Sequence, residues 1–215
     1  MRSRYTFAAA IVAVCALLAA AVLYLAQPGE TTRRPVETYV GDVRLVVPAA
    51  YFRFEYAKVG GRMQEIDLAA DAQTFRPARL QRNFNPTGPD PLSNTIFLTI
   101  QQPEGRIDPA ERTTRLFTRF LQPDTWSHPG GLVMRRFQNG SPYENEDLYM
   151  APPEGRRFAA RCPRPRQPPS PLPATCIAEV RMDGVEVRMR FSADLLADWD
   201  RLLESTKGLI QSFRR

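Results

Sequence analysis

Few side chains in this 215-residue protein could perform chemistry, and their spacing matches no familiar catalytic set. The single histidine, His128, directly follows Ser127. A histidine activates a serine nucleophile only where the two side chains meet, and adjacent residues rarely aim their side chains at each other. We therefore expect His128 to be a loop residue without a catalytic role. A serine–lysine pair would need Lys58 or Lys207, and we expect Lys207 on the exposed side of the last helix.

Acidic residues offer two further kinds of site. A carboxylate-dependent hydrolase of cell-wall material needs two acids that face one cleft. Candidates for such a pair are Asp67, Asp71 and Glu144, which the sequence does not bring together. The cluster Glu144, Glu146 and Asp147 offers oxygen ligands for Ca²⁺ but lacks the spaced D-x-D/N-x-D/N-G loop. We interpret this cluster as the solvated end of a hairpin.

Sequence motifs for nucleotide, metal and hydrolase chemistry are absent. The chain contains no G-x-x-x-x-G-K-S/T, G-x-G-x-x-G, H-E-x-x-H or G-x-S-x-G. One histidine and three cysteines also exclude His-pair chemistry and any site that needs four thiolates. We therefore expect no catalytic residue, no metal site, no cofactor and no enzymatic activity.

Cys162 and Cys176 are the two cysteines that follow the amino-terminal segment, and proline is frequent between them. A proline-rich loop cannot join a sheet ladder, so it needs another means of holding its ends together. A disulfide that closes about 15 residues would stabilise the fold by roughly 3 kcal/mol. We predict this disulfide, and with it an oxidising compartment. The alternative is two unrelated buried thiols.

An uncharged stretch, residues 5–26, lies near the amino terminus. As a helix it would rise about 33 Å, enough to cross a hydrocarbon core of about 30 Å. Arg2 and Arg4 precede it and favour an amino terminus in the cytoplasm. We predict a cytoplasmic segment 1–4, a transmembrane signal anchor 5–26 in the inner membrane, a linker 27–38 and a periplasmic domain 39–215.

Two other fates of the amino-terminal segment compete with the anchor. Cleavage by signal peptidase needs small residues at positions −3 and −1, and Tyr24 is too large for a cut before Gln27. Lipid attachment at Cys15 needs a small preceding residue, where Val14 stands. We favour the anchor over cleavage and interpret Cys15 as an apolar filler of the span.

The domain reads as α+β, with one mostly antiparallel sheet packed by two amphipathic helices. Apolar alternation and turn residues predict strands over Tyr39–Val47, Tyr51–Tyr56, Arg62–Leu68, Asn94–Gln101, Leu132–Phe137 and Glu146–Met150. The last two of these are expected to pair across the turn at Asn139-Gly140.

The dipeptide Asp183-Gly184 separates two alternating runs, which is typical of a hairpin with a two-residue type I′ turn. Its register sets apolar residues opposite one another on one face: Met182 and Val185, Val180 and Val187, Ala178 and Met189, Cys176 and Phe191. On the other face it sets opposite charges against each other: Arg181 with Glu186, and Glu179 with Arg188. Since Cys162 shares an alternation with Phe158 and Ala160, both sulfurs of the predicted disulfide can point into the core.

Two helices follow from capping residues and apolar spacing. The first begins at Asp108, has Pro109 at its first position and runs to about Leu121. Its inward residues are expected to be Leu116, Phe117, Phe120 and Leu121, and its outward residues Arg112, Arg115 and Arg119. The second is capped by Ser192 and carries a one-sided apolar stripe from Leu195 to Phe213. We expect it to lie across the sheet.

Basic residues exceed acidic ones, and the net charge of +6 falls to +4 once residues 1–26 are set aside. Arginine alternates with aromatic residues, as in Phe52-Arg53-Phe54, but no stripe of consecutive basic positions exists. A nucleic-acid partner is therefore not expected. A tethered domain of this charge favours at most a weak attraction to anionic lipid headgroups.

The order of segments resembles small single-span envelope proteins of Gram-negative bacteria. A basic amino end and an anchor lead into the strand-rich opening Gly41-Asp42-Val43-Arg44-Leu45, and the chain ends on the helix from Leu195 to Phe213. More loosely it resembles periplasmic immunity proteins, which neutralise secreted toxins. These resemblances imply a non-enzymatic envelope protein that acts by contact with a periplasmic protein. The alternative is a domain that binds a small ligand or lipid between the sheet and the last helix.

Overall fold

The computed structural model describes residues 34–78, 93–105, 107–164 and 175–214. The predicted cytoplasmic segment 1–4, the anchor 5–26 with Cys15, and linker residues 27–33 lie outside this part of the chain. Within it, no helix has the length and apolar character needed to cross a membrane. The compact unit that holds the described residues spans Pro35–Arg215.

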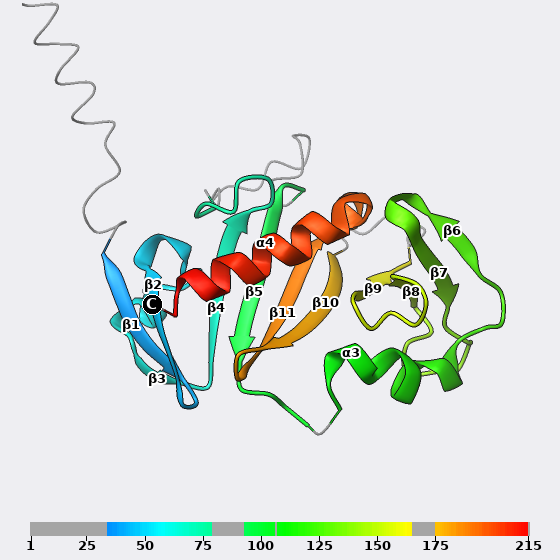
Figure 1. Cartoon of the computed structure of the whole chain (residues 1–215), viewed down its shortest axis with the longest axis horizontal. Coiled ribbons are helices and arrows are strands. Elements are labelled where there is room, and N and C mark those ends of the chain that lie inside the picture. Colours follow the sequence, from blue (N-terminus) through cyan, green and yellow to red (C-terminus); the bar gives the residue numbers. More distant parts are fainter. Residues whose placement is uncertain (1–33, 79–92, 106, 165–174, 215) are drawn as a thin grey trace, which may run out of the picture. The chain divides into compact units, whose positions relative to one another are not determined.

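An eight-stranded antiparallel sheet forms most of this unit (Figure 1). Its strands, in chain order, are β4 (Glu65–Asp71), β5 (Thr95–Gln101), β6 (Trp126–His128), β7 (Leu132–Arg136), β8 (Glu146–Met150), β9 (Ala159–Pro163), β10 (Thr175–Met182) and β11 (Val185–Ser192). The spatial order is β4-β5-β11-β10-β9-β8-β7-β6. The strand predicted over Asn94–Gln101 is present as β5. The two strands predicted to pair across Asn139-Gly140 are β7 and β8, which do pair.

The β10–β11 hairpin has the predicted register at every position. Met182 pairs with Val185, and the pairing continues to Cys176 with Phe191. Asp183 and Gly184 both adopt positive φ angles, 48° and 87°, as a type I′ turn requires. The apolar face of this hairpin is buried, with Val187, Met189 and Phe191 at 0% exposure.

The unit contains a second, three-stranded sheet, so the prediction of a single sheet is wrong. The prediction of one strand over Tyr39–Val47 is wrong as well. It consists of β1 (Pro35–Val40), β2 (Val43–Pro48) and β3 (Gly61–Met63), with β1 between the other two and parallel to β3. A tight turn at Gly41, whose φ is 62°, divides the predicted strand into β1 and β2. Because β1 begins at Pro35, the folded unit includes the last four residues of the predicted linker 27–38.

An ion pair ties the exposed side of β1 to β2. Arg44 Nε donates to Glu37 Oε1 over 2.9 Å, and the Tyr39 hydroxyl donates to the same oxygen over 2.7 Å. These hydrogen bonds, chiefly that from Arg44, lower the pKa of the Glu37 carboxyl to about 2.

The strand predicted over Tyr51–Tyr56 is also wrong. The segment instead forms two short 3₁₀ helices, η1 (Ala49–Tyr51) and η2 (Glu55–Val59). Tyr51 and Phe52 are adjacent and both buried, which a strand with alternating faces cannot achieve on one side of a core. The strand predicted over Arg62–Leu68 is divided into β3 and β4.

The last helix covers one face of the eight-stranded sheet (Figure 1). It consists of a 3₁₀ segment, η6 (Ala193–Asp198), followed by α4 (Trp199–Ser212), and the hydroxyl of Ser192 caps η6 as predicted. The apolar stripe is buried at Leu196, Leu202, Leu203, Ile210 and Phe213. The Trp199 indole N–H donates to the carbonyl of Gly130, in the short η5 turn (Pro129–Gly131), over 2.8 Å.

The helix predicted from Asp108 begins as expected but is not regular. Asp108 accepts a hydrogen bond from the Ala110 amide, and α3 (Pro109–Arg112) then passes into a π turn, η3 (Thr113–Phe117), and a 3₁₀ turn, η4 (Thr118–Phe120). The segment packs over a second, smaller apolar cluster: Phe117, Leu121, Phe137, Leu148 and Met150.

Candidate functional site

The histidine and its serine neighbour do not form a catalytic pair. Ser127 and His128 are consecutive residues of β6, so their side chains point to opposite sides of the strand. His128 Nδ1 lies 3.0 Å from the carbonyl oxygen of Pro129, and its ring contacts the Tyr149 ring edge to face at 4.9 Å. The imidazole therefore packs beside an aromatic ring at the edge of the sheet.

The three acids considered for a hydrolase are not brought together. Asp67 and Asp71 lie on β4, whereas Glu144 precedes β8, and four strands separate β4 from β8. Asp67 accepts a hydrogen bond from the Thr99 hydroxyl over 2.7 Å. Glu144 accepts one from the Gly140 amide over 2.7 Å and so closes the β7–β8 turn.

Asp71 organises the turn that follows β4. Its carboxylate accepts hydrogen bonds from the amides of Gln73 and Thr74 and from the Thr74 hydroxyl. Burial acts to raise the pKa of Asp71, but the hydrogen bonds from Thr74 and Gln73 outweigh it and lower the pKa. The carboxylate is thus held ionised as a structural acceptor.

The two lysines weighed for a serine–lysine pair are each joined to an acid on their own helical turn. Lys58 contacts Glu55 and Lys207 contacts Glu204, the latter over 2.9 Å.

Two acids of the predicted cluster, Glu146 and Asp147, are paired with arginines on or just after β9. Arg161 donates to Glu146 over 2.6 Å, and Arg164 donates to Asp147 over 2.7 Å. Among the described residues, no group of three or more His, Cys, Asp or Glu side chains could hold a metal ion. Glu146 and Asp147 therefore link neighbouring strands, whereas Glu144 is exposed in the β7–β8 turn, as the predicted hairpin end requires.

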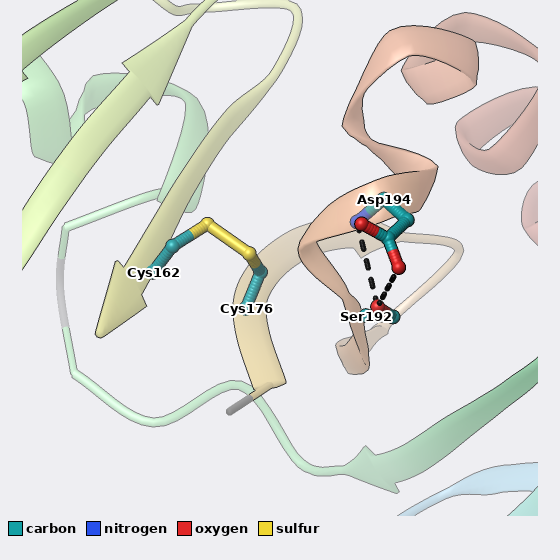
Figure 2. Close-up of a disulfide and its surroundings, with 4 residues drawn as sticks. All are labelled: Cys162, Cys176, Ser192 and Asp194. Carbon is teal, nitrogen blue, oxygen red and sulfur yellow. Dashed lines mark hydrogen bonds between the residues drawn. A yellow bond between two sulfur atoms is a disulfide. The ribbon is translucent and has the colours of Figure 1, made fainter. Parts of the chain in front are cut away.

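The disulfide joins Cys162 of β9 to Cys176 of β10 (Figure 2). Both residues are buried, at 4% and 0% exposure, on the face of the sheet that α4 covers. Residues 165–174 of the loop between them lie outside the described part of the chain.

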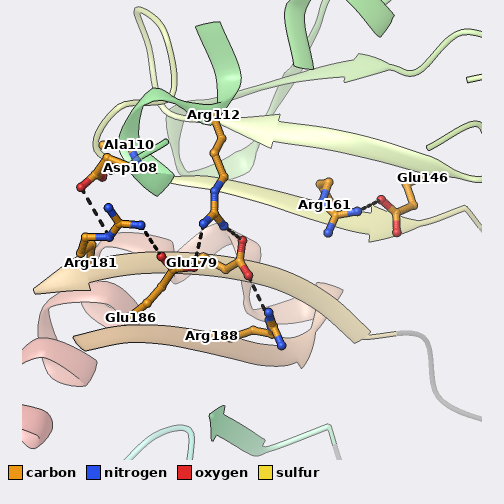
Figure 3. Close-up of polar contacts among 9 residues, drawn as sticks. All are labelled: Asp108, Ala110, Arg112, Glu146, Arg161, Glu179, Arg181, Glu186 and Arg188. Carbon is orange, nitrogen blue, oxygen red and sulfur yellow. Dashed lines mark hydrogen bonds and ion pairs between the residues drawn. The ribbon is translucent and has the colours of Figure 1, made fainter. Parts of the chain in front are cut away.

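A network of arginines and glutamates occupies the opposite face of the β10–β11 hairpin (Figure 3). The two predicted cross-strand pairs are present: Arg181 donates to Glu186 over 2.8 Å, and Arg188 donates to Glu179 over 2.9 Å. Arg112, at the end of α3, donates to both glutamates, and its bond to Glu186 measures 2.7 Å. The prediction that Arg112 points outward is therefore wrong.

Arg112 turns toward the sheet because α3 ends after a single turn. The π turn that follows changes the angular position of later residues, so Arg112 does not share the solvent side of Arg115, which is 62% exposed. Burial acts to lower the pKa of Arg112, but the hydrogen bond to Glu186 and the charge of Glu179 outweigh it and raise the pKa. Each glutamate is bound by two guanidinium groups, an arrangement that stabilises a carboxylate and makes it a poor general base.

The exposed apolar side chains are the remaining feature with a bearing on function. In the described part of the chain, the large hydrophobic residues on the surface are Phe54, Tyr56, Val59 and Trp126. In the arginine–aromatic pattern Phe52-Arg53-Phe54, Phe52 is buried and Phe54 is exposed.

Comparison with known proteins identifies a shared fold and no family. No family model matches the chain, and no curated protein matches it. The fold is similar to that of Smlt3025, an immunity protein of the Stenotrophomonas maltophilia type IV secretion system. The two share a TM-score of 0.61 and 16% identity over 88% of this chain and 99% of that one.

A second solved structure with a similar fold is the iron-regulated outer membrane lipoprotein FrpD of Neisseria meningitidis. Its TM-score is 0.50 with 12% identity, over 87% of this chain and 95% of that one. At these identities the likeness establishes the α+β architecture that the three proteins share.

Proposed function

We propose that this chain is a membrane-anchored periplasmic protein that acts without catalysis, by binding another protein in the manner of an immunity protein. The observation that carries the proposal is the fold shared with an immunity protein over 88% of this chain and 99% of that one. The buried disulfide between β9 and β10 supports it, since disulfides persist in oxidising compartments such as the periplasm.

The placement of the chemistry-bearing side chains also supports a binding role. The histidine packs on a tyrosine ring, the acids of β4 close a turn and bind a threonine, and the buried glutamates are each held by two arginines. The alternative, a ligand pocket between the sheet and the last helix, is the weaker proposal, because Leu202, Leu203 and Ile210 of α4 pack in one apolar core with the strands.

The binding role is tested with the proteins encoded by the genes that flank this one. Each is directed to the periplasm of cells that make the full chain or an empty vector. We expect the chain to restore growth and to co-purify with one toxin in a fixed ratio. Absence of protection against every neighbouring toxin, together with turnover of a substrate by the purified protein, would overturn the proposal.

The anchor is tested separately. A fluorescent reporter that matures only in the cytoplasm, fused after Arg215, should remain dark. The intact mass of protein recovered from membranes should include residues 1–26. A bright fusion contradicts the topology, and a mass that lacks these residues indicates cleavage.

A further inference from the structure

Exposed apolar side chains concentrate in one short segment. Phe54 is 38% exposed, Tyr56 71% and Val59 86%, and all three lie within η2 and the residue that precedes it. Exposed hydrophobic residues scattered singly are ordinary, but a cluster on the surface indicates contact with a partner or a membrane. We call residues 53–60 the η2 loop.

The η2 loop is held in shape by contacts within the folded unit. Ala57, between the two most exposed residues, is 3% exposed and anchors the loop to the core. The rings of Phe54 and Tyr56 stack at 5.6 Å with an interplanar angle of 12°. The Arg53 guanidinium lies over Phe54 and over Phe97 of β5, at 5.1 and 4.5 Å. The exposed rings are therefore presented by a fixed support and do not need to be ordered on binding.

The loop lies beside the first residues of the folded unit. The Thr38 hydroxyl of β1 donates to the Gly61 carbonyl over 3.0 Å, in the parallel pairing of β1 with β3. A Cβ on Gly60 would lie 2.4 Å from the Glu37 carbonyl oxygen and 3.2 Å from a Val36 methyl. The carboxyl end of the η2 loop, which directly follows Val59, thus lies against the second and third residues of the unit, close to the point where the chain continues toward its amino terminus.

That position limits the distance from the loop to the predicted anchor. Residues 27–34 separate the end of the predicted span from β1, and eight residues reach at most about 29 Å even when fully extended. If the anchor of the proposed function is correct, the η2 loop is therefore always near the membrane surface.

We propose that the η2 loop is a second membrane contact, in which Tyr56 and Val59 enter the interfacial layer of the outer leaflet of the inner membrane. Tyrosine rings favour this layer, where the ring meets acyl chains and the hydroxyl stays hydrated. The cations of Arg53 and Lys58 lie at headgroup level while their stems cover apolar surface.

Apolar insertion, more than attraction between charges, should drive the contact of the η2 loop with the membrane. Lys58 pairs with Glu55, and nearby Arg44 pairs with Glu37, so Arg53 supplies the main uncompensated charge among the described residues of this surface. The contact should therefore be almost independent of salt and of the content of anionic lipid. A polybasic surface would weaken strongly in salt.

The test uses the full chain with Cys15→Ala, so that an introduced cysteine is the one free thiol. An environment-sensitive fluorophore is attached at Val59→Cys or, as a matched control, at Asp124→Cys. Asp124 is exposed and precedes β6, at the far edge of the sheet from β4. Both proteins are reconstituted in vesicles of phosphatidylethanolamine and phosphatidylglycerol that contain acyl chains brominated near the headgroup.

We expect at least about threefold stronger quenching at position 59 than at position 124, because interfacial groups sit about 5–10 Å into the headgroup–acyl boundary. Adding Tyr56→Ser should reduce the quenching, and high salt should leave it unchanged. The side chains of Tyr56 and Val59 are exposed, so we expect both variants to fold. An unchanged circular dichroism spectrum would establish that the fold is retained.

Each failure has its own meaning. If the protein floats with the vesicles and position 59 is quenched no more than position 124, the membrane contact is refuted and the anchor stands. If the protein does not float with the vesicles, the anchor fails and the membrane contact fails with it. A photo-crosslinker at position 59 that attaches in cells to a protein and not to lipid also refutes the proposal, and assigns the loop to a protein partner.

Discussion

Replacement of Arg112 with methionine removes the cation that bridges the two glutamates of the β10–β11 hairpin. The side chain of Glu186 is 2% exposed and that of Arg112 17%, so water can replace the lost partner only in part. A hydrogen bond to a charged group contributes about 1.5–3 kcal/mol, and two such bonds are lost. A buried ion that loses every partner costs about 3–5 kcal/mol of stability. The loss here should lie at the lower end of that range, because Arg181 still binds Glu186. We expect Arg112→Met to lower the free energy of unfolding by about 3 kcal/mol.

The measurement is urea unfolding of the full chain, followed by tryptophan fluorescence and circular dichroism. Arg115→Met is the matched control, since its pair with Glu111 is exposed and should contribute about 0.5 kcal/mol or less. A double-mutant cycle with Glu186→Gln should give a coupling energy of about 1–3 kcal/mol. The reasoning is refuted if Arg112→Met costs no more than Arg115→Met, or if the cycle gives no coupling.

Three further predictions concern the three-stranded sheet, the disulfide and the contact between η5 and η6. Glu37→Gln should lower the free energy of unfolding in urea near pH 7. The difference in this free energy from wild type should shrink as pH falls from about 4.5 toward 2, because a lowered carboxyl pKa contributes stability that is lost through that range. A difference that grows with acidity contradicts this. Replacement of Cys162 and Cys176 by serine should cost roughly 3 kcal/mol in thermal or urea unfolding, and a loss below about 1 kcal/mol would show that the cross-link constrains little. Gly130→Ala should destabilise more than Gly131→Ala: both have positive φ, which costs about 1–2 kcal/mol, but only at Gly130 would the new Cβ lie 2.5 Å from a backbone oxygen of η6. Equal melting temperatures for these two variants would contradict the close approach.

The hairpins show where local sequence suffices to predict structure. Asp183-Gly184 is flanked by two long alternating runs, and the turn, the apolar face and the charged pairs all require one register. Gly41-Asp42 is a turn of a similar kind, but the runs beside it are only six residues each and offer no row of matched charge pairs, so β1 and β2 look like one strand. A Gly-Asp pair between two β-branched runs was the signal for this hairpin.

The candidate site was harder to predict, because its contacts join segments that are distant in sequence. Glu179 and Glu186 are matched to arginines by the hairpin register alone, and both pairs were predicted. Arg112 reaches the same glutamates from a helix about 70 residues earlier, and no local pattern encodes that approach. The wrong strand prediction over Tyr51–Tyr56 has a related cause. The 3₁₀ turn that exposes Tyr56 is held by the burial of Ala57, which depends on packing against other elements.

The strands β10 and β11, which join β5 to β9 in the eight-stranded sheet, are the last two strands in the described part of the chain. Until they are available, β4–β5 and β6–β9 are two separate groups of strands, and each has an unpaired edge that can template aggregation. A polypeptide that emerges amino end first therefore cannot complete this sheet until its carboxyl-terminal part has followed. Such an order of assembly is compatible with the export across a membrane that the proposed function requires. A carboxyl-terminal truncation that reaches β11 also removes η6 and α4, and it would separate β4 and β5 from the other strands of the sheet. Trimming residues before Pro35 would leave every strand pairing of the described residues in place.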